Sequence, residues 1–214
     1  MPTLSKPAIS ALLQPYIPTA PSLLVSQLSI YLDLLLKWNA RTNLTAIRDP
    51  NEIVRRHFGE SLFAAQHLAP TPLSTRRTLL DFGSGAGFPG LPIQLFHPEI
   101  AVTLAESQNK KATFLREVIR TLGLKTEVWA ARAETMPPSR QFDTVTMRAV
   151  DDMDVALPAA TARVAPGGQL VILTTLNHAP TVGRSIPIPN SQAGVLSLQT
   201  FHVEHSNPQT LISN

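Results

Sequence analysis

The alternation of apolar strand-like runs with helical patterns between residues 78 and 175 most constrains the fold of this 214-residue chain. The strand-like runs are TLLDF, AVTLAES, TEVWAA, DTVTMRA and QLVILT, and APGG at 165–168 is a turn leading into the last of them. Between them, NKKATFLREVIRTLGL is the most regular helical pattern, with a stop at Gly123. Strands that alternate with helices pair in parallel and build a doubly wound α/β sheet. Such sheets bind ligands at the carboxyl ends of their strands, where the strand order reverses.

The first 68 residues carry a different pattern, which is helical. Leu24, Leu28 and Leu35 belong to one buried stripe over residues 22–38. A second helix begins at Asp49 as cap and Pro50 in the first turn. We therefore expect a helical extension over 1–68 and one compact domain over 69–214. The proline-dotted end contains VLSLQTFHV and QTLIS, which we expect to form a final antiparallel pair.

The composition limits the chemistry that this chain can use. It has no cysteine, which excludes disulfides, thiolate metal sites and a cysteine nucleophile. His57 and His67 lack the carboxylate–histidine spacing of a ligand set, so we expect structural histidines and no metal. A net charge of +3 is compatible with a nucleic-acid partner but does not require one. The most apolar segment, residues 22–38, is too polar and short to span a bilayer, so we expect a cytoplasmic protein without membrane contact.

The stretch LLDFGSGAGFPG, residues 79–90, follows the first predicted strand and has two interpretations. Gly85, Gly87 and Gly90 form G-x-G-x-x-G, which is typical of NAD or FAD binding. Asp81 followed by Gly83 and Gly85 instead favours S-adenosylmethionine, which carries an ammonium and a sulfonium and no phosphate. A carboxylate at this strand end would oppose a pyrophosphate, which a helix N-terminus otherwise attracts. The alternative for Asp81 is a simple helix cap.

Two further acidic residues follow strand-like runs. Glu106 ends the second run, where a carboxylate can accept hydrogen bonds from both ribose hydroxyls; taken alone, this feature also fits NAD. Glu134, in AARAET, follows the third run and is placed to lie beside an adenine, although an exposed loop glutamate is an equal alternative. Pro89 agrees with the methyl donor, because it removes one amide that a phosphate would use.

Four segments carry a resemblance to a known family. They are KWNARTNLTAIRDPNEIVRRHFGESL, LLDFGSGAGFPGLPIQLFHPEIAVTLAESQNKKATFLREV, ARAE and MRAV. Over about residues 28–175 the chain resembles the bacterial 16S rRNA (guanine-N7)-methyltransferases. The resemblance implies a Rossmann-like class I S-adenosylmethionine-dependent methyltransferase fold with an N-terminal helical extension. It also implies methyl transfer to N7 of guanine 527, in the 530 loop of 16S rRNA within the 30S subunit; we expect a monomer.

The resemblance also implies roles for single residues. Gly83 and Phe88 would line the cofactor, Ala133 and Glu134 would contact its adenine end, Arg148 would lie near the transfer site, and Asn43 and Arg132 match positions used for function. His57 with Ser61 would lie near the domain junction, as packing or positioning. Because N7 carries a lone pair and no proton, no general base is expected, and alignment suffices. Arg148 is expected to hold a phosphate or guanine O6, with a carboxylate-paired or helix-capping arginine as the alternative.

RNA contact is expected at basic residues of two helices, with a merely solvated helix face as the alternative. They are Lys110, Lys111, Arg116 and Arg120, together with Arg48, Arg55 and Arg56. Two departures from the family lie further on: the fifth strand is not followed by a lysine–glycine pair, and no Lys or Arg follows Arg184. The alternative function is therefore a divergent S-adenosylmethionine-binding RNA-binding protein with lost or altered activity. A third, an NAD-linked oxidoreductase, rests only on the G-x-G-x-x-G reading.

Overall fold

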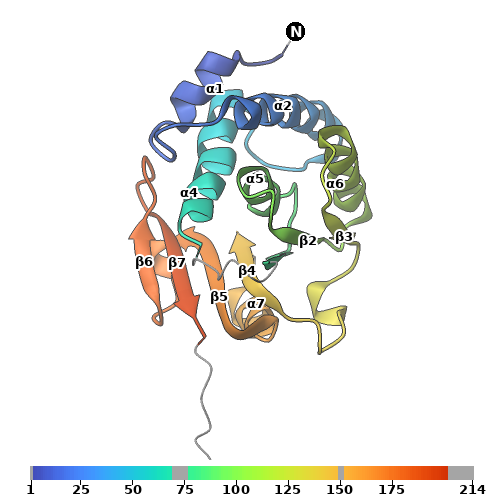
Figure 1. The fold of residues 1–214 in the computed structure, drawn as a ribbon, viewed down its shortest axis with the longest axis vertical. Coiled ribbons are helices and arrows are strands. Elements are labelled where there is room, and N and C mark those ends of the chain that lie inside the picture. The colour runs from blue at the N-terminus through green and yellow to red at the C-terminus, as the bar shows by residue number, and fades with distance from the viewer. Residues whose placement is uncertain (1, 69–76, 149–151, 202–214) are drawn as a thin grey trace, which may run out of the picture.

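A computed structural model describes residues 2–68, 77–148 and 152–201 and contains one seven-stranded sheet within these ranges (Figure 1). The strands are β1 (Thr78–Phe82), β2 (Ala101–Ala105), β3 (Glu127–Trp129), β4 (Phe142–Arg148), β5 (Val164–Thr175), β6 (Arg184–Pro187) and β7 (Gly194–Thr200). Their order is β3-β2-β1-β4-β5-β7-β6, and β1 to β5 pair in parallel. The order reverses between β1 and β4, so the predicted doubly wound sheet is confirmed.

Helices cover both faces of this sheet. They are α1 (Lys6–Leu13), α2 (Ser22–Thr42), α3 (Pro50–Glu52), a π-helix η1 (Ile53–Gly59), α4 (Glu60–Gln66), α5 (Gly90–Phe96), α6 (Asn109–Leu122), α7 (Met153–Thr161) and the short 3-10 turns η2 (Ala133–Thr135) and η3 (Leu176–His178). In Figure 1 the N-terminal helices lie over α5 and α6, and α4 contacts α5 while α2 contacts α6. Within the described ranges, no helix has both the length and the apolar character needed to cross a membrane.

The local signals act as the sequence indicates. The Asp49 carboxylate accepts a hydrogen bond from the Glu52 amide at 2.9 Å, and Pro50 occupies the first turn, so the predicted helix start is confirmed. The Glu52 side chain does not complete a capping box, because its Oε1 binds Arg55 at 2.8 Å instead. At the end of α6, Gly123 adopts the left-handed conformation with φ 65°, which ends the helix as predicted.

Alternate side chains of the strands enter two separate cores. Leu79 faces the N-terminal helices and Leu80 faces α7, because successive strand residues point to opposite faces. The larger core runs without interruption from Ile9 on α1 through Leu28 on α2 to Phe114 on α6. The helical extension thus shares its core with the sheet. The predicted boundary at residue 68 falls where a described range ends.

The C-terminal part departs from the predicted pattern. Strand β5 begins at Val164 instead of residue 169, and its pairing with β4 jumps from Val164 to Gln169, so that APGG is a bulge within the strand. Strand β7 does lie in an antiparallel arrangement, but β5 and β6 occupy its two edges. The predicted partner QTLIS lies outside the described residues, so its pairing stays a prediction. Strand β6 escaped prediction because its side chains are mostly exposed and show no apolar alternation.

Gly59 permits a close approach between η1 and Tyr16, which follows α1 in the chain. A Cβ at this position would lie 2.5 Å from the Tyr16 ring carbons Cδ2 and Cε2. We expect Gly59→Ala to lower the free energy of unfolding by about 1–3 kcal/mol, because overpacking forces the ring to move. Urea unfolding measures the change. In a Tyr16→Ala background the methyl group has room, so the same substitution should be neutral or slightly stabilising, since alanine favours helix. An equal loss in both backgrounds would contradict this packing.

Candidate functional site

The glycine loop between β1 and α5 opens onto space where a ligand can approach the backbone. Gly83 and Gly85 have φ of 71° and 57°, and an added Cβ at Gly83 would meet nothing within 4 Å. Gly87 serves a different purpose, since a Cβ there would lie 2.6 Å from the Tyr31 hydroxyl. The first two glycines thus expose backbone to a ligand, and the third allows tight packing beneath the loop.

A cavity of about 620 Å³ lies at the carboxyl ends of β1, β2 and β4. Its walls come from the glycine loop, the residues after β2, the η2 turn, the start of α7 and the N-terminal extension. Buried apolar side chains, Phe82, Ala105, Ala133 and Ala156, line one part of it. This is the position that the strand order predicts for a ligand, and an apolar slot of this kind suits an aromatic base.

Most of the predicted site residues line this cavity. They are Gly83, Gly85, Phe88, Glu106, Arg132, Ala133, Glu134 and Arg148. Glu106 is held firmly, because its Oε2 accepts a hydrogen bond from the Gly85 amide at 2.9 Å and its Oε1 accepts one from the Gln108 amide at 2.7 Å. A carboxylate can accept further hydrogen bonds from a ligand while keeping these two.

Asp81 and Asn43 take positions next to the cavity instead of in its lining. Asp81 is fully buried beneath the loop, where Oδ2 accepts from the Gly90 amide at 3.0 Å and Oδ1 from the Thr146 hydroxyl at 2.9 Å. The structure supports the capping interpretation of this residue, and burial raises its pKa to about 6. Asn43 ends α2 in the left-handed region, and its Oδ1 accepts from Arg48 at 2.9 Å.

A tyrosine of the N-terminal extension contacts the glycine loop from within the core. The fully buried Tyr31 of α2 donates its hydroxyl hydrogen to the Ala86 carbonyl. Its ring also stacks on Phe88, with centroids 5.4 Å apart and planes at 11°. Tyr31 lies in the helix predicted over residues 22–38, in register with its buried stripe. The structure adds that its polar end positions the loop.

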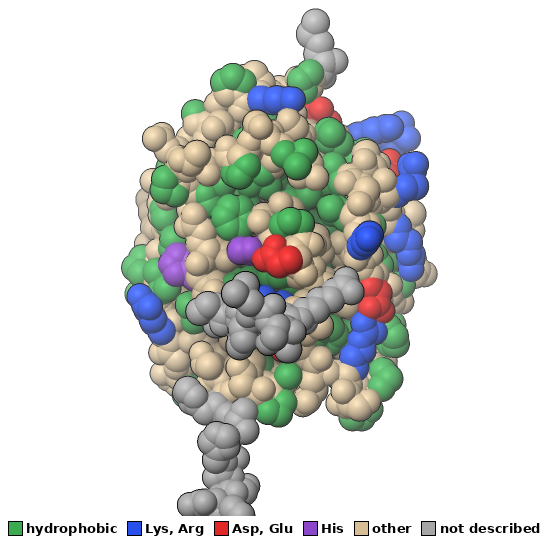
Figure 2. Space-filling view, viewed as in Figure 1, with side chains coloured by type: hydrophobic (Ala, Val, Ile, Leu, Met, Phe, Trp, Pro, Cys, Tyr) green, Lys and Arg blue, Asp and Glu red, His purple; other side chains and the backbone are tan. Residues whose placement is uncertain are grey.

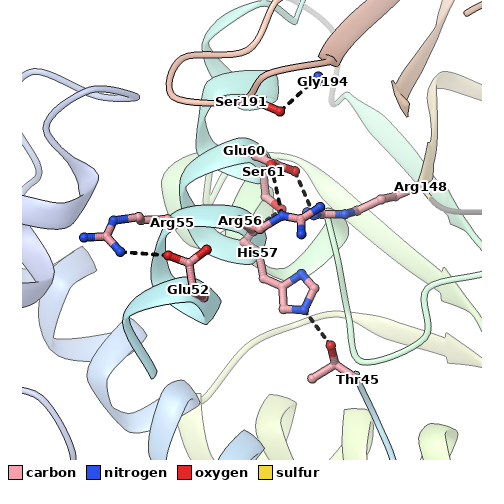
Figure 3. A network of polar contacts seen from close by, with 10 residues as sticks. All are labelled: Thr45, Glu52, Arg55, Arg56, His57, Glu60, Ser61, Arg148, Ser191 and Gly194. Carbon is pink, nitrogen blue, oxygen red and sulfur yellow. Dashed lines mark hydrogen bonds and ion pairs between the residues drawn. The ribbon is translucent and has the colours of Figure 1, made fainter. Parts of the chain in front are cut away.

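His57 closes the cavity from the side of the extension (Figure 3). Its ring stacks on Phe88 at 4.6 Å, and its Nε2 lies 2.7 Å from the Thr45 hydroxyl. The buried Nδ1 has no hydrogen-bond partner among the described residues. Desolvation, followed by the charge of Arg148, lowers the pKa of His57 to about 3, so the ring is neutral. The implied positioning role fits this place, and the ring also faces the ligand space.

Arg163 was missed by the sequence analysis. Its buried guanidinium donates to the carbonyls of Pro137 at 2.7 Å, Met136 at 2.8 Å and Glu134 at 3.1 Å. These carbonyls belong to the turn that carries Ala133 and Glu134 into the cavity wall. Arg163 therefore fixes that wall. An isolated arginine before a strand reads as a surface residue, so the sequence offers no signal for this role.

Arg148 forms a buried ion pair with a residue that the sequence analysis did not single out. From the end of β4 its Nη2 reaches Glu60 Oε2 at 2.7 Å, while Glu60 Oε1 lies 3.9 Å from Arg56 Nε (Figure 3). The carboxylate-paired alternative for Arg148 is thus present in the structure. Burial raises the pKa of Glu60, which the two arginines oppose. Glu60 lies seven residues after Ile53 and four before Ala64, which are both fully buried. This helical spacing could have predicted that the Glu60 side chain is buried.

The basic residues divide into two groups. On α6, Lys110, Arg116 and Arg120 are exposed and Lys111 lines the cavity, and Figure 2 shows Lys and Arg side chains gathered along the edge where Figure 1 places α6. The three arginines of the extension instead contact Asn43, Glu52 and Glu60 within the protein.

The sheet, with its strand order and its flanking helices, has the class I S-adenosylmethionine-dependent methyltransferase fold. A structure of the T. thermophilus 16S rRNA N2 G1207 methyltransferase in complex with AdoMet and guanosine aligns with a TM-score of 0.53 and 22% identity, covering 67% of this chain and 43% of that one. The family follows from sequence: residues 24–200 match the GidB model, described as rRNA small subunit methyltransferase G, and the chain belongs to this family.

Two relatives named ribosomal RNA small subunit methyltransferase G show how far the similarity extends. The Xanthomonas campestris pv. campestris (strain B100) protein is 41% identical over 144 residues, which are 67% of this chain and 65% of the relative. The Chloroflexus aggregans protein is 42% identical over 197 residues, covering 87% of this chain and 79% of the relative. The match thus spans just under two thirds of the first relative and more of the second. Among the described residues, no three His, Cys, Asp or Glu side chains gather closely enough to hold a metal ion.

We expect Tyr31→Phe to weaken binding of adenosylhomocysteine about fivefold to tenfold, because the Ala86 carbonyl loses its donor and the loop loses its anchor. Isothermal titration calorimetry measures the affinity. Tyr16→Phe, a second buried tyrosine that packs against Gly59, is the matched control and should leave the affinity unchanged. Reduced stability of Tyr31→Phe with unchanged affinity would contradict a role in positioning the loop.

The pH dependence of stability should reveal the buried His57. Its pKa falls from 6.5 in the unfolded chain to about 3, so acidification in this window protonates the unfolded state first and destabilises the fold. Asp81 acts in the opposite sense, since its pKa rises from 3.8 to about 6 and the folded state takes up the proton first. His57→Gln removes only the first contribution. The stability advantage of the wild type over this variant should shrink from about pH 7 to about pH 4.5 in urea titrations, and a constant difference would contradict the assignment.

Proposed function

We propose that this protein transfers a methyl group from S-adenosylmethionine to N7 of guanine 527 in the 530 loop of 16S rRNA. It would act as a cytoplasmic monomer on the 30S subunit. The observation that carries the proposal is the open glycine loop and its cavity at the β1–β4 switch point, in a chain that belongs to the GidB family.

The cavity residues fit the methyl donor. The apolar slot beside Ala133 suits the adenine, Glu106 can accept from the ribose hydroxyls, and the open backbone at Gly83 and Gly85 suits the methionine portion. Glu134 and Phe88 complete the proposed cofactor site, and Arg132, which lines the same cavity, is proposed to act at the transfer site with Arg148. Asp81 would act on the cofactor through the loop that it caps, and Asn43 through the adjoining turn. Bound S-adenosylmethionine supplies an electrophilic methyl group on its sulfonium.

The proposed reaction requires no general acid or base from the protein. The N7 lone pair forms the new bond to carbon, the carbon–sulfur bond breaks, and its electron pair goes to sulfur, so the positive charge passes from sulfur to the purine. No proton has to leave N7. The residues present agree with this: the low pKa of His57 makes it a weak base, and Glu60 is paired with Arg148. The proposed contribution of the protein is alignment and exclusion of water.

The α6 surface supports binding to the RNA backbone. Its basic side chains lie next to the cavity, and Lys111 belongs to both α6 and the cavity lining. Phosphate contacts give affinity without base selectivity and make binding weaken steeply with added salt. The absence of Lys and Arg from the sequence after Arg184 favours one alternative, an S-adenosylmethionine-binding RNA-binding protein that no longer methylates.

The decisive measurement adds the protein and S-adenosylmethionine to 30S subunits that lack the modification. We expect N7-methylguanosine at position 527 after nuclease digestion and nucleoside analysis. Gly83→Asp is the matched control: aspartate tolerates the left-handed backbone, and its carboxylate would occupy the open space beside the loop. This variant should remain folded and transfer no methyl group.

Two outcomes would contradict the proposal. Binding of adenosylhomocysteine without methyl incorporation would establish the non-methylating alternative. Thermal stabilisation by NAD and not by adenosylhomocysteine would establish the dinucleotide interpretation of the glycine loop, since a ligand stabilises the fold that binds it.

A further inference from the structure

A second cavity, of about 640 Å³, lies on the other side of Arg148. Arg56 and Glu60 form one wall, Leu173 to Thr175 at the end of β5 form another, and the loop Asn190–Gly194 closes it, braced by a 2.9 Å hydrogen bond from the Gly194 amide to Ser191 Oγ (Figure 3). Arg148 lines both cavities, whereas Glu60 lines only the second. Arg148 is therefore the residue that the linings of both cavities share.

The Arg148–Glu60 pair retains unused hydrogen-bonding capacity. Arg148 Nη1 has no hydrogen-bond partner among the described residues, although it is buried. On Glu60, Oε2 holds Arg148 at 2.7 Å, but Oε1 has only Arg56 Nε at 3.9 Å, which is beyond hydrogen-bond distance. The pair therefore combines a donor without a partner, Arg148 Nη1, with an acceptor that no hydrogen bond occupies, Glu60 Oε1. A purely structural pair would be expected to satisfy the buried Arg148 Nη1, since an unpaired buried polar group is costly.

We propose that Glu60 and Arg148 recognise the acceptor base in the second cavity, with Glu60 as the residue that specifies guanine through its N1–H and N2 amino group. This inference rests on the proposed methyl transfer and adds the base-reading residue to it. Guanine is the base whose Watson–Crick edge carries two adjacent donors beside an acceptor, O6. A carboxylate accepts two adjacent donors, and a guanidinium donates to the carbonyl oxygen.

The order of atoms on guanine matches the order of the two residues. Around the base, N7 is followed by O6, then N1–H, then the N2 amino group. Placing O6 at Arg148 and the two donors at Glu60 leaves N7 on the side of the first cavity, where the methyl donor is proposed to bind. Met153 and Leu173 offer apolar contacts for the base within the same cavity. One ion pair would thereby select the base and direct its nucleophilic atom.

Inosine provides the test, because it keeps N7, O6 and N1–H but lacks the N2 amino group. Subunits are assembled on rRNA with either guanosine or inosine at the acceptor position, and kcat/KM is measured for each. The wild type should prefer guanosine by about tenfold or more, the usual value of a good base contact. Glu60→Gln should lose about tenfold to a hundredfold on guanosine and methylate both substrates at nearly equal efficiency. Because both substrates are assayed with the same preparation of each variant, the ratio of the two kcat/KM values does not depend on how much of that variant is folded.

Glu52→Gln is the matched control, since Glu52 lies earlier in the same helical segment, is exposed and pairs with Arg55. It should preserve the guanosine preference. An unchanged guanosine-to-inosine ratio in Glu60→Gln, or a ratio abolished equally in Glu52→Gln, would overturn the role of Glu60 and leave the methyltransferase proposal intact. Failure of the wild type to methylate either subunit would overturn the proposed function itself. If Glu60→Gln turns over too slowly, dissociation constants for the two subunits, measured with adenosylhomocysteine present, give the same ratio.

Discussion

The stack of Tyr31, Phe88 and His57 is the contact on which the arrangement of the site depends. Phe88 belongs to the glycine loop, whereas the other two rings come from the N-terminal helices, so loop and extension share one aromatic core. The hydrogen bond from Tyr31 to Ala86 adds direction to this packing. Glycines at positive φ would by themselves leave the loop free to move. The extension is therefore part of the structure that holds the glycine loop in place, and it shares one core with the sheet instead of having a core of its own.

A second link between extension and sheet is electrostatic. Glu60, at the junction of η1 and α4, neutralises Arg148 at the end of β4, and both side chains are largely buried. A buried ion pair contributes little net stability, because desolvation offsets its attraction. The position of the pair beside the two cavities is therefore a better guide to its role than its contribution to stability. The same two charges that join the extension to the sheet also line the second cavity, and Arg148 lines the first cavity as well.

The sequence was sufficient for the parallel strands β1 to β5 and for the glycine loop, because these follow from local patterns: apolar runs, caps and turn glycines. Several residues of the cavity lining, among them Phe88 and Ala133, were instead predicted from the family resemblance. The sequence was insufficient where long-range contacts decide. Arg163 acts on a turn some 30 residues earlier in the chain, and Glu60 meets an arginine 88 residues away. The π-helix η1 also turns Arg56 and His57 away from the period of 3.6 residues that a helical pattern assumes. The partner of β7 was missed because edge strand β6 has little apolar surface.

In the proposed function, affinity for RNA and choice of base would be carried by different parts of this molecule. The exposed cations of α6 can attract phosphates, which are the same in every sequence. The Arg148–Glu60 pair is largely buried beside the second cavity, where a base turned into that cavity would meet it. Loss of basic residues from the C-terminal hairpin would then reduce the strength of RNA binding without changing which base is selected. If the proposed base recognition holds, the specificity would rest on Arg148 and Glu60, whereas the C-terminal region would affect how tightly, and at which ionic strength, the substrate is held.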